Sequence, residues 1–309
     1  MTGQAASAQA GKGAGREVET GILFMVVGML LVPGIDAIAK VLSASVPAGQ
    51  VAWARFFFQT LYLAPFALMA GPIALNRWLW IHVLRGLLLA LATLFFFWSV
   101  KYLPLADAIS IFFVSPLILT LLAALFLGET IGWRRLSAVL VGFAGALLIV
   151  QPSYAVFGWA SVLPLGAALT FATYLVLTRR LARVERATTM QFYAGAFGCL
   201  ALSLALWAGA EADIPVIDPI WPTAWEWGLM AGLGVIGTGA HILVVHAFRR
   251  APPSVLAPFQ YLEIISATLL GLLIFGDFPS PTTWLGIAII VASGLYVFYR
   301  ERKTARRSA

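Results

Sequence analysis

A single carboxylate in the middle of a long apolar run is the clearest candidate for chemistry. Glu263 follows the stretch Phe259-Gln260-Tyr261-Leu262. An ionisable group inside a bilayer costs at least about 2.5–3.5 kcal/mol on insertion scales, so it should face a polar cavity or a partner. The carboxylate can bind an ammonium group or exchange a proton, or it can be protonated and hydrogen-bond between helices. We favour a binding role, in which Gln260, Tyr261 and a bend at Pro258 supply further contacts.

Three charged residues near the start of the chain form a second candidate. Asp36 and Lys40 are four residues apart, so they share a helix face and can pair, and Arg55 lies near the matching end of the next apolar run. These residues could act as a gate or bind an anionic group. The alternative, which we favour, is a neutralised cluster that holds two helices together near an interface, where charged side chains reach water.

Three further side chains are candidates for lining a cavity. His241, Trp98 and Tyr174 each have polar neighbours on their own apolar runs. Aromatic faces can bind aromatic or cationic molecules, and histidine can exchange a proton near neutral pH. Ordinary packing is the competing explanation for each of them. His241 and His246 are five residues apart and point about 140° apart on a helix, so they do not form a metal pair. We predict no metal site and no catalytic residue.

The composition places these residues in a membrane protein. Of the 309 residues, 61% are hydrophobic and 11% are charged, whereas soluble domains carry about 25% charged residues. This deficit excludes an ordinary soluble enzyme, a disordered protein and a nucleic-acid-binding protein. Residues 1–19 are small and polar and are expected to be a disordered cytoplasmic tail. We predict ten transmembrane helices near residues 21–42, 51–69, 80–101, 105–127, 133–150, 156–178, 190–208, 226–248, 254–275 and 282–299.

The basic residues predict which helix ends face the cytoplasm. If both termini are cytoplasmic, 17 of the 20 Lys and Arg residues lie on that side, in agreement with the positive-inside rule. The longest loop on the other side, residues 209–225, is acidic instead. His82 lies with Arg85 near the cytoplasmic end of the third predicted helix, where we expect His82 to be interfacial.

The chain repeats at an offset of 148 residues. The blocks 104–129 and 252–277 share Pro, Thr, Leu and Gly residues at six positions, and each block ends in a Gly-acidic pair. Each block opens the fourth helix of a five-helix half. Because five is odd, the second half enters the membrane upside down relative to the first. Such inverted repeats are typical of secondary transporters that bind their substrate between the halves.

These blocks resemble the drug/metabolite transporter superfamily in its ten-helix form, with two EamA-type halves. Gly142-Phe143-Ala144-Gly145 in the fifth predicted helix and Ser293-Gly294 in the tenth fit the same pattern. The resemblance implies an all-α integral membrane fold with two inverted five-helix repeats at residues 20–150 and 156–300. A basic cytoplasmic tail at residues 301–309 follows them. Within this superfamily the chain is similar to exporters of amino acids, particularly aromatic ones, in the bacterial inner membrane.

The resemblance therefore implies a secondary transporter that exports amino acids, including aromatic and large neutral ones, or similar small metabolites by alternating access. Glu263 would bind the ammonium group of a zwitterion, and protons are a candidate coupling ion. The alternatives are an importer of another metabolite, such as riboflavin or S-adenosylmethionine, and a multi-span membrane enzyme. The sequence contains no Walker motif, no Gly-x-Ser-x-Gly elbow and no His-Glu-x-x-His motif, so ATP-driven transport and the common hydrolases find no support. No cofactor is expected.

Overall fold

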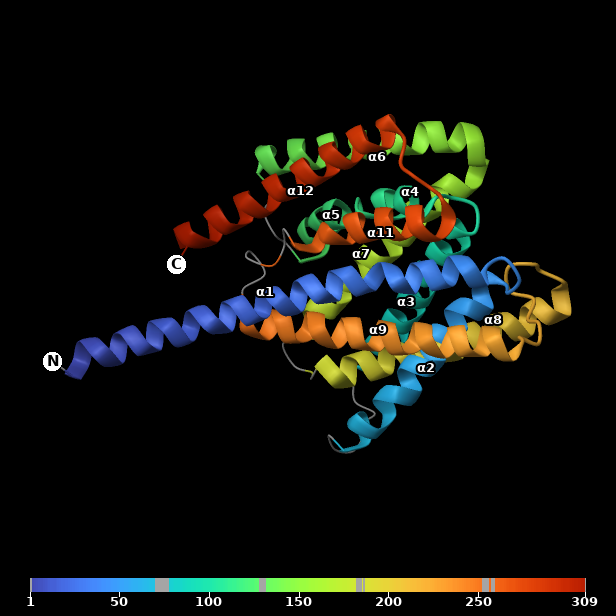
Figure 1. Ribbon diagram of the computed structural model, residues 1–309, viewed down its shortest axis with the longest axis horizontal. Coiled ribbons are helices and arrows are strands. Elements are labelled where there is room, and N and C mark those ends of the chain that lie inside the picture. Colours follow the sequence, from blue (N-terminus) through green and yellow to red (C-terminus); the bar gives the residue numbers. More distant parts are fainter. Residues whose placement is uncertain are drawn as a thin grey trace.

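The protein, seen in a computed structural model, is built from helices that run along a common direction (Figure 1). The structure describes residues 2–69, 78–127, 132–181, 185, 187–251, 256 and 259–308. In chain order the helices of this part are α1 (Thr2–Leu42), α2 (Ala48–Met69), α3 (Leu79–Val100), α4 (Leu105–Phe112), α5 (Ser115–Leu127), α6 (Trp133–Phe157), the 3-10 helix η1 (Gly158–Val162), α7 (Leu163–Leu181), α8 (Ala187–Ala212), α9 (Ala224–Arg250), α11 (Leu262–Leu270), the π-helical turn η2 (Gly271–Phe275) and α12 (Pro281–Ser308).

Many of these helices are long and apolar enough to cross a membrane. Within the described residues, six stretches qualify by length and hydropathy: Glu17–Leu42, Leu79–Val100, Leu105–Phe126, Leu136–Thr178, Thr189–Ala212 and Ala224–Val244. Two shorter apolar helices, Leu262–Phe275 and Pro281–Tyr296, accompany them. The predicted all-α, multi-span membrane fold is thus confirmed. The number of ten spans and the side of the membrane that the termini face stay predictions.

Both ends of the described chain are helical beyond the predicted spans. Helix α1 begins at Thr2 and α12 continues to Ser308, whereas the composition predicts disorder for residues 1–19. Residues 2–16 are rich in Ala, and extending an existing helix avoids the cost of nucleating a new one. Figure 1 shows both ends of the chain at the same end of the bundle, which we call the terminal end.

The fourth predicted helix is broken in the middle. Helix α4 ends at Phe112 and α5 starts at Ser115, although the apolar run over 105–127 predicts one helix. Pro116 supplies the physical reason, because it has no amide N–H to donate to the carbonyl of Phe112. The ninth predicted helix is irregular as well, since α11 is followed by the π-helical turn η2. Discontinuous helices of this kind line the binding sites of many transporters.

The packing of the helices is symmetric between the two halves of the chain. Each contact between one helix of the first half and one of the second has a counterpart with the halves exchanged. The contact of α1 with α9 corresponds to that of α3 with α7. In the same way, α1 with α11 corresponds to α5 with α7, and α2 with α9 corresponds to α3 with α8. The remaining major pairs, α2 with α8 and α6 with α12, join helices that hold the same position in each half. In Figure 1, α6 and α12 form one edge of the bundle, and α1 lies beside α9.

Glycines set the close contact between α6 and α12. A Cβ atom on Gly145 would lie 2.8 Å from Cγ2 of Ile289, and one on Gly286 would lie 2.8 Å from the carbonyl oxygen of Gly145. Both distances are too short for real side chains. Gly142 meets Leu117 and Ser293 in the same way. The Gly142–Gly145 motif therefore lets two helices approach more closely than larger residues would allow.

The end of the bundle opposite the termini, which we call the far end, is joined by contacts between the halves. The amide of Gly49 donates to the carbonyl of Val216 at 2.9 Å. The side chain of Gln50 donates to the carbonyl of Ile220 at 2.8 Å and accepts from its amide at 3.0 Å. The hydroxyl of Ser45 donates to the carboxylate of Glu226. The first and second halves are thus tied together at this end.

Candidate functional site

Four ionisable side chains from four helices form what we call the central charged cluster. Its members are Asp36 on α1, Arg55 on α2, His241 on α9 and Glu263 on α11, two from each half of the chain. Asp36 interacts electrostatically with both Arg55 and Glu263, and Arg55 interacts with His241. Asp36 is only 8% exposed. Charged groups placed together away from water need partners, so this cluster is the leading candidate for a binding site.

The guanidinium of Arg55 has donors to spare. Its Nη1 donates to Oγ1 of Thr93 on α3 at 2.9 Å. Its Nε is buried and has no hydrogen-bond partner among the described residues. Within the same part of the chain, neither Asp36 nor Glu263 comes close enough to Arg55 for an ion pair. A buried donor without a partner costs about 1–3 kcal/mol, and a ligand carboxylate would remove that cost.

The two carboxylates of the cluster share a related problem. No hydrogen bond links Asp36 or Glu263 to another described residue, and the two like charges act on each other. Like charges repel strongly in a medium of low dielectric constant. Either a proton or a ligand cation can neutralise them. The cluster therefore offers two sites for positive charge next to one site for negative charge.

His241 faces the cluster with one ring nitrogen already used. Its Nδ1 lies 2.8 Å from the carbonyl oxygen of Gly237, one turn earlier on α9. Because a carbonyl only accepts, Nδ1 is the donor, and Nε2 is the acceptor of the neutral ring. Oγ1 of Thr238, on the same helix, is buried and has no partner among the described residues. Helix α9 thus brings the Nε2 atom of His241 to the cluster and carries a second polar atom without a partner on Thr238.

Irregular backbone on α1 supports the position of Asp36. Pro33 lies within α1, three residues before Asp36, and removes one helical hydrogen bond. The hydroxyl of Ser266 on α11 donates to the carbonyl of Leu30 at 2.8 Å. This bond ties α1 to the helix that carries Glu263. The bend that we predicted at Pro258 lies outside the described residues.

The predicted cavity residues are dispersed. Tyr174 on α7 interacts electrostatically with Arg55 and accepts a hydrogen bond from Nη2 of Arg85 at 3.3 Å, so it borders the cluster. Tyr261 packs its ring 5.4 Å from that of Phe113. Its hydroxyl lies directly against Gly294 of α12. Gln260 is half-buried one residue earlier.

Trp98 lies at the far end, where it lines a cavity of about 280 Å³. Its ring centroid is 4.8 Å from that of Trp159 in an edge-to-face contact. The other residues that line this cavity are Ala48, Lys101, Tyr102, Ile214, Pro215 and Val216. Trp98 is therefore a candidate for the entrance at the far end, and it lies about one and a half turns along α3 from Thr93.

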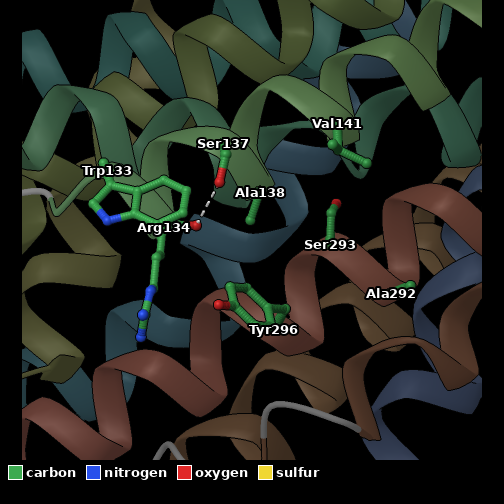
Figure 2. Close-up of a pocket in the computed structure, with 8 residues that line it drawn as sticks. All are labelled: Trp133, Arg134, Ser137, Ala138, Val141, Ala292, Ser293 and Tyr296. Carbon is green, nitrogen blue, oxygen red and sulfur yellow. Dashed lines mark hydrogen bonds between the residues drawn. The ribbon is translucent and has the colours of Figure 1, made fainter.

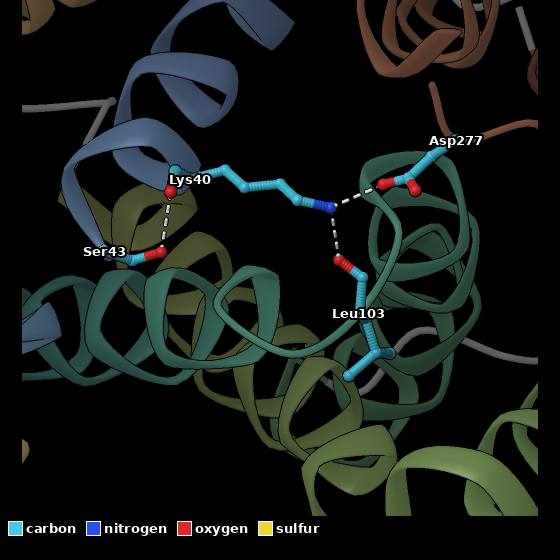
Figure 3. A network of polar contacts seen from close by, with 4 residues as sticks. All are labelled: Lys40, Ser43, Leu103 and Asp277. Carbon is cyan, nitrogen blue, oxygen red and sulfur yellow. Dashed lines mark hydrogen bonds and ion pairs between the residues drawn. The ribbon is translucent and has the colours of Figure 1, made fainter. Parts of the chain in front are cut away.

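Lys40 pairs with a partner that is distant in sequence. Its Nζ lies 2.7 Å from a carboxylate oxygen of Asp277, with the two side chains 15% and 33% exposed. It also donates to the carbonyl of Leu103 at 2.9 Å, as Figure 3 shows. Lys40 is therefore not part of the charge cluster that we predicted from Asp36, Lys40 and Arg55. Its long side chain extends away from α1 to Asp277 and Leu103, and so joins the first half of the chain to the second (Figure 3).

A buried arginine near the terminal end was missed as a functional residue by the sequence analysis. Arg85 is only 1% exposed, and His82, which we expected to be interfacial, is equally buried. Its Nε donates to Oγ1 of Thr178 at 3.0 Å and its Nη1 donates to the carbonyl of Met190 at 3.3 Å. Arg85 therefore joins α3 to α7 and α8. An arginine inside a predicted span was the signal for such a role.

The chain matches one known family over most of its length. The EamA-like transporter family matches it twice, at residues 19–151 and 158–299. An S-adenosylmethionine uptake transporter of Rickettsia bellii is 30% identical over 271 residues, which cover 87% of this chain and 89% of the relative. A riboflavin transporter of Vibrio cholerae is 29% identical over 93% of this chain and 95% of the relative.

Two further similarities add to this match. A pseudopaline exporter of Pseudomonas aeruginosa is 27% identical over 89% of this chain and 95% of the relative. A protein of known crystal structure superposes with a TM-score of 0.60 and 22% identity, over 91% of this chain and 97% of that chain. The second similarity shows a shared fold.

Proposed function

Because this chain belongs to the EamA-like transporter family, we propose that it carries a net-cationic amino acid derivative of the S-adenosylmethionine type. The chain is a membrane transporter of small metabolites and not an enzyme. The observation that carries the proposal is the central charged cluster, in which two carboxylates and one guanidinium lie together without pairing among the described residues.

Charge counting favours this class of substrate. Asp36 and Glu263 offer two negative charges, and Arg55 offers one positive charge. S-adenosylmethionine presents the opposite set, since it has an ammonium group, a sulfonium group and one carboxylate. Riboflavin has no charge to match. A neutral amino acid has one cation fewer and would need a proton to reach the same balance.

The energetic cost of a mismatch supports the same choice. Each ionised side chain without a partner inside the membrane costs about 2.5–3.5 kcal/mol on insertion scales. A ligand that leaves one carboxylate without a cationic partner does not remove this cost for that carboxylate. Each 1.4 kcal/mol of binding free energy lost in this way lowers the affinity about tenfold. We therefore expect the sulfonium charge to contribute measurably to recognition.

The architecture supports alternating access. The pairing of α1 with α9 and of α3 with α7 is what two halves related by a two-fold axis in the membrane plane would give. We propose ten transmembrane helices in two inverted five-helix repeats, 20–150 and 156–300, with both termini in the cytoplasm of a bacterium and the protein in its inner membrane. The cluster would then lie between the halves, where access can switch.

We propose uptake as the direction of transport, because the similar protein of Rickettsia bellii is an S-adenosylmethionine uptake transporter. Export of amino acids with a coupled proton is the second candidate. A neutral amino acid together with one proton carries the same net charge as S-adenosylmethionine. The two candidates therefore fit the same cluster and differ in the molecule that supplies the second positive charge.

A counterflow experiment tests the proposal. Purified protein in sealed liposomes, loaded with unlabelled S-adenosylmethionine, should take up the labelled compound from outside. Unlabelled S-adenosylmethionine should compete, whereas S-adenosylhomocysteine, which lacks the sulfonium charge, should compete poorly, as should riboflavin. Aromatic amino acids and lysine complete the panel. Strong competition by riboflavin, or exchange of neutral amino acids alone, would overturn the proposed substrate class and leave the family assignment intact.

A further inference from the structure

An outward-facing groove between α6 and α12 is lined by none of the residues of the central charged cluster. Its volume is about 380 Å³, and it lies beside the first turns of α6 and the middle of α12. Trp133 on its rim is 73% exposed. The residues that line it are Trp133, Arg134, Ser137, Ala138, Val141, Ala292, Ser293 and Tyr296 (Figure 2).

The groove lies next to the glycine contact of the two helices. Gly142, Gly145 and Gly286 let α6 and α12 approach closely toward the far end, and Gly142 lies against Ser293, which also lines the groove. The lining combines small residues, such as Ala138 and Ala292, with the large side chains of Trp133 and Tyr296. The close helix contact thus borders an open groove.

Polarity changes along the groove in one direction. In Figure 2, Trp133 and Arg134 lie at one end and Val141 and Ala292 lie toward the other. The Arg134 guanidinium is exposed, 5.5 Å from the centre of the Trp133 ring, and has no carboxylate at ion-pair distance in the described part of the chain. Trp and Tyr side chains prefer the level of the lipid headgroups. This order matches a phospholipid, with its headgroup above its acyl chains.

We propose that the groove binds one anionic phospholipid, whose phosphate contacts Arg134 and whose acyl chain lies against Ala138 and Val141. Basic pockets between transmembrane helices are suited to such headgroups. The sequence adds positive charge just beyond Tyr296, with Arg300, Arg302, Lys303, Arg306 and Arg307. A second copy of the chain is a poorer occupant, because a two-fold contact through this groove would bring two Arg134 residues and two of these basic segments together.

Quenching of tryptophan fluorescence tests the proposal on the full chain in vesicles. The protein is reconstituted in phosphatidylcholine vesicles that contain a rising fraction of brominated phosphatidylglycerol or of brominated phosphatidylcholine. Because the chain has 11 Trp residues, the signal of Trp133 is obtained as the difference between the wild type and Trp133→Phe. One basic side chain near the surface is worth about fivefold in binding an anionic lipid. We expect half-maximal quenching at an about fivefold lower fraction of the anionic lipid.

Matched variants decide the outcome. Arg134→Gln should abolish the preference for the anionic lipid, whereas Arg180→Gln, an exposed arginine near the end of α7 at the same end of the bundle, should keep it. Equal quenching by both lipids, an unchanged preference in Arg134→Gln, or the same loss in Arg180→Gln would overturn the proposal. Absence of quenching by either lipid, with a dimer of the chain covering Trp133, would overturn it as well.

Discussion

Replacing Glu263 by Gln separates a cation-binding role from a packing role. The substitution keeps the size of the side chain and removes its charge. A Gln side chain can still hydrogen-bond between helices. The central charged cluster would then hold one carboxylate, Asp36, and one guanidinium, Arg55, which balance the two charges of a simple zwitterion. We expect the variant to lose its preference for S-adenosylmethionine.

The size of the effect follows from the charges. Two unit charges 4 Å apart attract by about 4 kcal/mol at an effective dielectric constant of about 20. Desolvation offsets part of this, and hydrogen bonds to charged groups contribute about 1.5–3 kcal/mol. We therefore expect Glu263→Gln to weaken S-adenosylmethionine binding by about 2 kcal/mol, or about 30-fold in half-saturating concentration. S-adenosylhomocysteine has one cationic group fewer, so it depends less on Glu263. Its half-saturating concentration should therefore change by less than about threefold in Glu263→Gln.

The assay is the concentration dependence of initial counterflow rates for both ligands, at equal protein incorporation. Glu211→Gln is the matched control, because Glu211 is exposed near the end of α8, far in sequence from the cluster residues. That variant should behave like the wild type. Equal losses for the two ligands in Glu263→Gln, or no loss for either, would refute the reasoning. Normal transport would assign Glu263 to helix packing.

Three further predictions concern the frame around this site. Lys40→Gln removes the partly buried 2.7 Å ion pair with Asp277. A cysteine introduced at Trp98 should then react up to about fivefold faster with a thiol reagent, since an ion pair near the surface contributes up to about 1 kcal/mol. An unchanged rate would show that the pair does not hold the entrance at the far end closed. Gly286→Ala should lower the free energy of unfolding by about 1–3 kcal/mol, measured by thermal unfolding. Gly132→Ala is the control, because a Cβ at Gly132 meets open space, and it should have no effect. Equal melting temperatures for the two variants would contradict the close helix contact. Arg85→Gln should destabilise the fold by about 1.5–3 kcal/mol, measured in the same way, because the acceptors on Thr178 and Met190 lose a charged donor. An unchanged melting temperature would show that these contacts contribute little.

The membrane fold could be predicted from the sequence because it depends on the length and hydropathy of each segment. The interior position of Glu263 follows from the cost of burying a charge, and Asp36 and Arg55 prove to be close enough to interact. From the sequence we favoured a structural role for those two residues near an interface. Their association with Glu263 depends on which helices are neighbours, and hydropathy does not encode that.

Two errors have the same origin. Lys40 lies four residues from Asp36, so helix geometry predicts that they pair, yet its partner is Asp277, 237 residues away. His82 was predicted to be interfacial from its position near one end of the helix. The structure buries it beside Arg85, which bonds to α7 and α8. Position along one helix is readable from sequence, whereas the face that a residue presents and its distant partners arise only on packing.

The break between α4 and α5 had a visible signal in Pro116, although the apolar run around it was read as one helix. The substrate class had no such signal. The family match supports transport of a small metabolite, and the named relatives carry different molecules. Amino acid export was suggested by a resemblance alone. The charges of Asp36, Arg55 and Glu263 limit the choice, because they can be counted against a ligand.

The central claim is tested most directly by accumulation of labelled S-adenosylmethionine in liposomes that contain the protein, under an imposed membrane potential. The cargo has one net positive charge, so a potential of about −60 mV inside should give about tenfold accumulation if the molecule crosses alone. Protein-free liposomes should show none. Entry of riboflavin without protein-dependent entry of S-adenosylmethionine would contradict the account.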